Sequence, residues 1–161
     1  MRDPILSVII ADAEGRSLDV YRDSEGYWTI GDGHLVSTDK TITEAHAREL
    51  CNAPWTPEQC EATRDAEIDA HWAQLCARWP WAASLPDWPR RGVVDMAYQL
   101  GVSGVAGFPH MLLALKAGDW ATAEAEALDS DGTPTAPGWH RQTPKRCEAT
   151  AAMLGNRVET G

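Results

Sequence analysis

Two carboxylic acids and one hydroxyl lie within a short stretch near the start of the chain, at Glu14, Asp23 and Thr29. Two carboxyl groups held in different environments can supply the general acid and the general base that hydrolysis of a glycosidic bond requires. A neighbouring hydroxyl can help to hold the attacking water. On spacing alone such a trio is more often ordinary surface polarity, so its chemistry depends on the elements that position it.

A helix is predicted immediately before the first of these acids. Asp3 followed by Pro4 is a good helix start, because an N-cap carboxylate precedes a proline at the first helical position. Apolar residues then recur at helical spacing, and Gly15 is a natural stop. Glu14 therefore falls in the last turn, where the backbone carbonyls present partial negative charge. This field favours the protonated form of Glu14, which is the form that a general acid needs.

From Ser17 onward the helical period disappears and a hairpin is predicted. Residues 20–22 and 27–30 form its two strands, joined by the turn 23–26. Residues 34–36 supply a short third strand. Because side chains alternate along a strand, Thr29 and the turn residue Asp23 can both point toward the end of the helix that carries the first acid.

The rest of the chain is predicted to be helical. Thr56, Pro57 and Gln59 form a capping-box pattern, which opens a helix that runs to about Arg78. Further helices are expected at residues 41–50, 90–100, 111–117, 120–128 and 144–154. The Trp-rich and Pro-rich stretch 79–89 favours a packed connection between helices, with sugar binding as the alternative. The predicted fold class is α+β, mainly helical, with a short antiparallel sheet.

Composition narrows the classes of partner. With 24 acidic and 14 basic side chains, the 161-residue chain has a formal charge of −10, which argues against nucleic acid or an anionic membrane as the main partner. We expect no targeting segment and no stable membrane insertion, because the early apolar stretch 5–11 is short and interrupted. The four cysteines lack the spacing of metal ligands, so we expect free, mostly buried thiols and no zinc.

Three blocks of sequence carry a resemblance to a known family. The first contains Glu14-Gly15, Tyr21-Arg22-Asp23, Trp28-Thr29-Ile30 and His34-Leu35; the second is Met96–Phe108 and the third is Trp139–Arg146. In this order they resemble the T-even-phage-type lysozymes, glycoside hydrolase family 24. The resemblance implies a single lysozyme-like domain over residues 1–161. Within it we expect an N-terminal lobe at about 13–57, a long connecting helix at about 57–78, and a helical lobe at about 79–161 packed with helix 3–14.

Members of that family are phage endolysins that hydrolyse the β-1,4 bond between N-acetylmuramic acid and N-acetylglucosamine in peptidoglycan. By the resemblance, Glu14 is the general acid that protonates the leaving oxygen. Asp23, with Thr29, positions and activates a water on the opposite face of the sugar. That layout inverts the anomeric configuration and needs roughly 6.5–9.5 Å between the carboxyl groups. The sequence also allows the closer spacing of a retaining enzyme, in which Asp23 would attack directly.

The resemblance also assigns supporting roles. Arg146 matches a basic residue that pairs with the catalytic acid, and a cation there favours the ionised form of Glu14, which opposes the effect of the helix end. His34 matches a histidine that pairs with a carboxylate on the connecting helix, here Glu67. We expect the His34–Glu67 pair to be a structural ion pair and to take no part in the chemistry.

Further positions match residues of the family that contact the glycan, namely Leu35, Tyr98 and Met111. Met111 and Glu126 replace side chains that are often small and polar or an amide in the family. The resemblance implies no cofactor and no metal. The pattern Asp129-Ser130-Asp131-Gly132 is similar to the start of a calcium loop, but no glutamate follows at the twelfth position, so a surface loop is the preferred interpretation.

The negative charge departs from what the resemblance implies, because enzymes of this family attack an anionic wall and are often basic. Long-range repulsion should slow the approach of so acidic a chain, most of all at low salt. Asp32 is expected to add a negative field beside the cleft. An acidic chain also suits a cationic polymer, so a hydrolase of a related glucosamine polymer such as chitosan is one alternative.

The resemblance also leads to expectations about the binding partners and the cellular location of the protein. The resemblance implies a monomer that binds peptidoglycan glycan strands. It would accumulate in the host cytoplasm and act in the periplasm and cell wall, after release by a holin-type protein. A second alternative is a non-catalytic virion or glycan-binding protein that keeps the fold.

Overall fold

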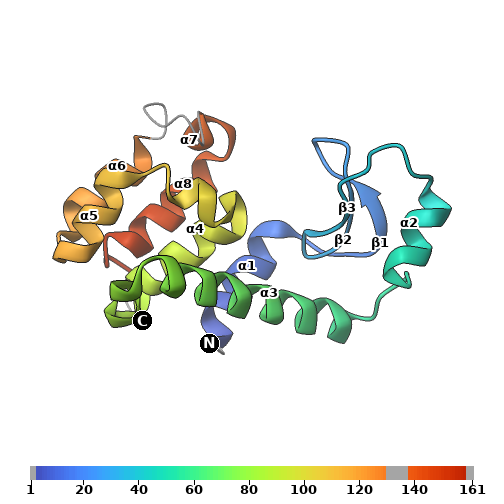
Figure 1. Ribbon diagram of the computed structural model, residues 1–161, viewed down its shortest axis with the longest axis horizontal. Helices are drawn as coiled ribbons and strands as arrows, with labels where there is room; N and C mark the ends of the chain where they lie inside the picture. The colour runs from blue at the N-terminus through green and yellow to red at the C-terminus, as the bar shows by residue number, and fades with distance from the viewer. Residues whose placement is uncertain (1–2, 130–137, 159–161) are drawn as a thin grey trace. The chain divides into compact units, whose positions relative to one another are not determined.

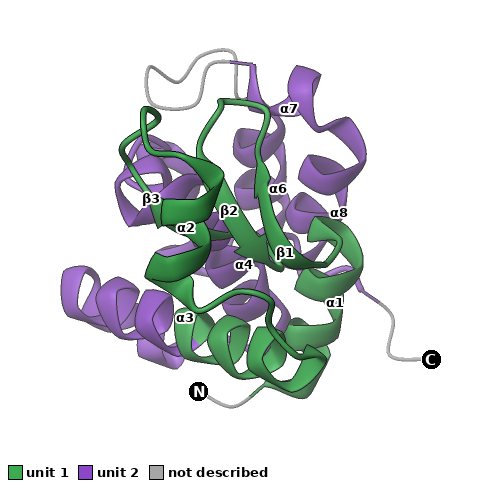
Figure 2. Cartoon of the chain, turned by 90° about the vertical axis from the view of Figure 1, so that its right-hand side faces the viewer, with its two compact units in different colours: residues 1–68 green, residues 69–161 purple. Residues whose placement is uncertain are grey.

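The structure is a computed structural model that describes residues 3–129 and 138–158 (Figure 1). The chain divides into two compact units, residues 1–68 and 69–161, which meet within one long helix (Figure 2). Helices make up most of the described residues, and unit 1 also contains a three-stranded antiparallel sheet. The predicted fold class, α+β and mainly helical, is therefore confirmed. The predicted arrangement of the lobes stays a prediction.

Unit 1 begins with helix α1 (Pro4–Glu14), which carries the first acid at its end. The carboxylate of Asp3 accepts a hydrogen bond from the backbone N–H of Leu6 at 3.1 Å, so the helix has the predicted cap. Gly15 ends the helix with a φ of 74°. Leu6 and Ile10 are fully buried one turn apart, and this apolar face fixes the orientation of the helix.

Three short strands follow in the order β1-β2-β3: β1 (Ser17–Arg22), β2 (Trp28–Gly31) and β3 (His34–Ser37). Both predicted hairpin strands and the predicted third strand are present, with ends displaced by at most three residues. Every residue of β2, the central strand, is buried. The indole of Trp28 anchors it, because its N–H donates to the Ile42 carbonyl at 3.0 Å.

Helix α2 (Glu44–Cys51) packs beside β1 and β3 and starts later than predicted. Asp39 explains the difference, since its Oδ1 accepts hydrogen bonds from the N–H of Thr41 at 2.8 Å and from its hydroxyl at 2.6 Å. Thr41 is thereby held in a turn. Thr43 is the N-cap instead, and its Oγ1 accepts from the His46 N–H at 3.2 Å.

Helix α3 (Pro57–Arg78) is the long helix predicted from the capping-box pattern. The reciprocal bonds of that motif are present. The Thr56 N–H donates to Gln59 Oε1 at 2.8 Å, and the Gln59 N–H donates to Thr56 Oγ1 at 3.2 Å. Two backbone donors are satisfied at once, which fixes where the helix begins.

All the regular secondary structure among the described residues of unit 2 is helical. After a 3-10 helix, η1 (Pro80–Ser84), come α4 (Asp87–Val105), α5 (Pro109–Ala117), α6 (Trp120–Leu128), α7 (Trp139–Gln142) and α8 (Pro144–Leu154). Helix α8 packs against α4 and α6, and α5 packs against α6 (Figure 1). Gly92 permits the contact of α4 with α8, because a Cβ there would lie 2.9 Å from the backbone nitrogen of Leu154.

Helices α6 and α8 have the predicted bounds, and α5 begins two residues early. Helix α4 is longer than predicted. Gly101, with a φ of 71°, interrupts the helix at the predicted end, but helical structure resumes beyond it to Val105. The sequence did not predict η1 and α7, because elements of four or five residues are too short to show a helical period.

The four cysteines all lie among the described residues and are free; Cys60 and Cys147 are buried. Of the calcium-like pattern, residues 130–132 lie outside the described part of the chain. Among the described helices, none by itself is both long and apolar enough to cross a bilayer. Helices α4 and α5 meet that criterion only together, across a bend of 117°.

Candidate active site

Glu14 is the last residue of α1, and its side chain is exposed. Gly33, in the turn between β2 and β3, faces it: a Cβ on Gly33 would lie 3.5 Å from Glu14 Oε2. Gly33 has a φ of 98°, which glycine tolerates and other residues rarely adopt. The backbone of the turn therefore approaches the carboxylate with no side chain between them. A pocket of about 220 Å³ lies beside it, lined by Glu14, Gly15, Arg16, Ser17 and Tyr21.

Asp23 starts the turn between β1 and β2 and is half-buried. Its Oδ1 accepts hydrogen bonds from the backbone N–H groups of Glu25 and Tyr27, each at 2.9 Å. These two bonds fix the carboxylate on the turn, as aspartate commonly does in this position. The other oxygen, Oδ2, accepts no hydrogen bond from any residue in the described part of the chain. One face of the carboxylate is thus fixed and the other is available.

Thr29 lies in the middle of β2 and is 4% exposed. In the strand register it is opposite Tyr21 on β1 and Leu35 on β3. Residues directly opposite each other in an antiparallel sheet project to the same face, so these three side chains form one row. The Thr29 hydroxyl has a long contact of 3.4 Å with the Tyr27 carbonyl. Within the described residues, this long contact is the only hydrogen bond of the Thr29 hydroxyl.

Tyr21 is affected by the charges of both acids, and the sequence did not predict it as a site residue. Burial raises the pKa of its phenol, and the negative charges of Glu14, Asp23 and Asp32 raise it further. The phenol therefore lies within the field of both candidate catalytic carboxylates. The signal that could have found it is the hairpin register, because a turn at residues 23–26 places Tyr21 opposite Thr29.

Asp32 is buried in the turn beside Gly33 and binds two arginines. Arg16 donates to both of its oxygens, from Nε at 2.9 Å and from Nη2 at 3.1 Å, and Arg64 on α3 donates from Nη1. Burial alone would raise the pKa of the Asp32 carboxyl, but the hydrogen bonds from Arg16 and Arg64 outweigh burial and lower it. The charge of Asp32 still raises the pKa of the nearby Tyr21 phenol, and the expected effect of its negative field on the catalytic carboxyl groups stays a prediction.

His34 and Glu67 are in contact, with 2.5 Å between His34 Nδ1 and Glu67 Oε1. The hydrogen bond to Glu67 raises the pKa of His34 and outweighs the opposing effect of burial. The ring of Trp55 packs on the imidazole, 5.5 Å between centroids. The expected pair therefore exists and joins β3 to α3; its supporting role stays a prediction.

The residues predicted to contact the glycan differ in exposure and in neighbouring side chains. Leu35 is 45% exposed on β3. Tyr98 lies on α4, and its ring meets the ring of His71 edge to face at 5.9 Å. Met111 on α5 is fully buried, so a contact between its side chain and a glycan would require neighbouring side chains to move. Glu126 on α6 lies 3.5 Å from the Nδ1 of His110.

Arg146 binds Asp95 within unit 2, and its expected pairing with Glu14 stays a prediction. Its Nη2 donates to Asp95 Oδ1 at 2.6 Å, and its Nε donates to Oδ2 at 3.3 Å. Thr150 and Gln99 donate to the same oxygen, Oδ2, at 2.5 Å and 3.0 Å. Asp95 is fully buried, so this network holds the Arg146 side chain in one orientation.

Unit 1 therefore presents two carboxyl groups in unlike surroundings around one phenol. Glu14 is exposed beside a pocket, whereas Asp23 is fixed by two amides and lies in the same hairpin as the Thr29 hydroxyl. Such a set can protonate a leaving group and activate a water. Across residues 3–129 and 138–158, no group of three or more His, Cys, Asp or Glu side chains is arranged to hold a metal ion.

Comparison with known proteins agrees with this chemistry. The model of the phage lysozyme family matches residues 11–131. The chain is 32% identical over 163 residues to the pre-baseplate central spike protein Gp5 of Enterobacteria phage T4, an alignment that covers 91% of this chain and only 27% of that protein. It is also 26% and 28% identical to probable T4-type lysozymes 1 and 2 of Dictyostelium discoideum, covering 92% of this chain and 89% of each relative.

Proposed function

The chain belongs to the phage lysozyme family, a family of lysozyme-type glycoside hydrolases, and on that premise we propose that it is a muramidase. It hydrolyses the β-1,4 bond between N-acetylmuramic acid and N-acetylglucosamine in peptidoglycan. The observation that carries the proposal is the pocket of unit 1, which Glu14 and Tyr21 line together, with Tyr21 opposite Thr29 in the hairpin whose turn holds Asp23.

Each member of the trio has a separate role in this proposal. Glu14 protonates the leaving oxygen, since it is exposed and lies beside the pocket of unit 1. Asp23 accepts a proton from the attacking water through its available oxygen, while the two backbone N–H groups hold its other oxygen. Thr29 helps to orient that water. The water attacks the anomeric carbon as the bond to the leaving oxygen breaks, so the configuration at that carbon inverts.

For the biological setting we propose lysis of the host cell from within. The enzyme accumulates in the host cytoplasm, and a holin-type protein gives it access to the periplasm and the cell wall. Its partner there is the glycan strand of peptidoglycan, which it meets as a monomer.

A second candidate is a lysozyme domain that belongs to the virus particle. The similarity to a central spike protein favours it, and the chain spans about a quarter of that relative. Mass spectrometry of purified particles distinguishes the two candidates: presence of the chain in the particle favours the second, and its restriction to infected cells favours lysis from within.

The catalytic assignment is tested with Glu14→Gln, which removes the transferable proton and changes the size of the side chain little. We expect clearance of chloroform-treated Gram-negative cells to fall by roughly 100-fold or more, the range for loss of a general acid. Glu25→Gln is the matched control, because it removes an exposed carboxylate from the nearby turn. Equal clearance by the wild type and Glu14→Gln would rule out the proposal.

Two further measurements refine the assignment. NMR of the first-formed anomer on a short muramyl oligosaccharide distinguishes inversion from retention. The rate of chitosan cleavage tests the alternative substrate. Faster cleavage of chitosan than of peptidoglycan would replace the muramidase proposal.

A further inference from the structure

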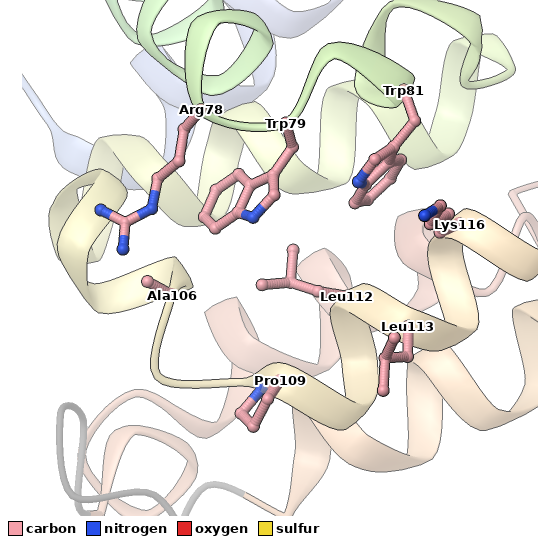
Figure 3. Close-up of a pocket in the computed structure, with 8 residues that line it drawn as sticks. All are labelled: Arg78, Trp79, Trp81, Ala106, Pro109, Leu112, Leu113 and Lys116. Atoms are coloured by element: carbon pink, nitrogen blue, oxygen red, sulfur yellow. The ribbon is translucent and has the colours of Figure 1, made fainter.

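Unit 2 has an open pocket of about 410 Å³, between the end of α3 with η1 on one side and α5 on the other (Figure 3). None of its lining residues belongs to the candidate active site. Aromatic, aliphatic and basic side chains line it: Arg78, Trp79, Trp81, Ala106, Pro109, Leu112, Leu113 and Lys116. A volume of this size accommodates a small ligand, such as one or two sugar rings.

Two indoles form one wall of the pocket. Trp79 and Trp81 project from the segment after α3 toward α5, where Leu112 and Leu113 form the opposite wall (Figure 3). Both tryptophans are half-buried, whereas Leu113 is 65% exposed. A flat aromatic wall facing an aliphatic one suits a ligand with a weakly polar face, as the C–H face of a pyranose has.

The indole N–H groups of Trp79 and Trp81 form no hydrogen bond within the described residues, a feature that they share with Trp72, Trp88 and Trp120. The indole N–H groups of Trp28, Trp55 and Trp139 each donate a hydrogen bond within the protein, at 3.0, 2.7 and 3.0 Å. Because the indoles of Trp79 and Trp81 are half-buried and line the pocket, these two donors are available to a ligand.

The charge of the pocket is opposite to that of the chain. Arg78 and Lys116 lie at its two ends (Figure 3), and no carboxylate lines it. The Arg78 guanidinium lies over the Trp79 ring, 5.2 Å from its centroid, which holds it at the pocket edge. Within residues 3–129 and 138–158, neither cation forms an ion pair, whereas buried Arg64 has a carboxylate partner.

We propose that this pocket binds a muramyl unit of the glycan, with the sugar ring against the indoles and a carboxylate of the unit, on its lactyl group or on its attached peptide, at Arg78 or Lys116. The uncommitted indole N–H groups would donate to oxygens of the sugar or its acetamido group. A neutral sugar would use the indoles and leave the two cations unpaired. The identity of the sugar rests on the proposed muramidase function. Such a pocket gives a chain of net charge −10 a local cationic attachment to an anionic wall.

The binding test uses the indole N–H signals of Trp79 and Trp81 in ¹⁵N NMR spectra, assigned with Trp79→Phe and Trp81→Phe. Because these signals report on the pocket alone, glycan held at Glu14 does not obscure them. In a Glu14→Gln background, the tetrasaccharide (GlcNAc–MurNAc)₂ should shift both signals. Replacing Arg78 and Lys116 together by glutamine should weaken that binding about tenfold, as expected for loss of charge-assisted contacts.

Two controls define the specificity of the site. Lys145→Gln removes an exposed cation from α8 and should leave the affinity unchanged. Chitotetraose, which has the same length and no carboxylate, should bind more weakly and should not respond to loss of Arg78 and Lys116. The proposal is overturned if the tetrasaccharide leaves both signals in place, or if the double variant binds it as tightly as the parent.

Failure of this proposal can be told apart from failure of the proposed function. With Glu14 intact, the Arg78→Gln, Lys116→Gln variant should hydrolyse short muramyl oligosaccharides at the wild-type rate and clear insoluble walls several-fold more slowly. Unchanged wall clearance together with normal hydrolysis overturns the pocket proposal alone. Loss of both activities to the same extent also overturns it, because the substitutions would then act on the chemistry.

Discussion

At the scale of single residues, Asp32 matters most for the integrity of unit 1. Its side chain is 1% exposed and pairs with Arg64, which is 6% exposed, and with Arg16, which is 30% exposed. Arg64 also donates to the Ser7 hydroxyl, at 3.0 Å from Nε and 2.8 Å from Nη2. The pairing thus joins α3, α1 and the turn that faces Glu14. Breaking a buried pair is costly, because the remaining charge has no compensation.

We therefore predict that Asp32→Asn lowers the free energy of unfolding by about 3 kcal/mol at neutral pH. The pKa of Asp32 is lower in the folded chain, so its contribution is fully present above the ordinary carboxyl value of 3.8 and is lost as the pH falls through the lowered value. Urea denaturation should show a large difference from wild type at pH 7 and a smaller one once the pH is below the lowered pKa of Asp32. Asp12→Asn, which removes an exposed carboxylate, is the control.

At the scale of elements, the turn between β2 and β3 positions the end of α1. Gly33 adopts a φ of 98°, which favours glycine, and a Cβ there would lie 3.5 Å from Glu14 Oε2. Gly33→Ala should strain the backbone by about 1 kcal/mol and so shift the turn relative to Glu14. Gly118→Ala is the matched control, since Gly118 also has a positive φ, of 74°, and lies in unit 2.

Both glycine variants should lose similar stability in thermal denaturation, but only Gly33→Ala should lose most of its lytic activity. Similar activity of the two would show that the turn has no part in placing the acid.

The same elements show what the sequence can predict. Caps and short turns depend on residues three or four positions apart, so the roles of Asp3, Gly15 and the Thr56–Gln59 box can be predicted from the sequence. The partners of Asp32 cannot be predicted in this way, because Arg64 lies 32 positions away and only the fold brings it close. The pocket of Trp79 likewise needs α5 as its second wall, and so the Trp-rich stretch alone favours a packed connection between helices over sugar binding.

At the scale of the whole molecule, the net charge of −10 governs the approach to a polyanionic wall. Ion pairs such as Arg16–Asp32 change the local field without changing this total, so repulsion persists at distances beyond individual contacts. Attachment at Arg78 and Lys116 acts only after close approach. The two effects therefore respond differently to salt: the long-range repulsion is screened readily, whereas a contact within a pocket is screened less.

We predict that wall clearance rises when ionic strength increases from about 10 mM to about 100 mM, because the screening length shrinks from about 30 Å to about 10 Å. Hydrolysis of a neutral chitooligosaccharide measures the chemistry without the repulsion and should change little over the same range. A cationic chitosan substrate should reverse the sign, since attraction would then be screened. A steady fall in the clearance of peptidoglycan with increasing salt would contradict this prediction, because the net charge would then not limit the encounter.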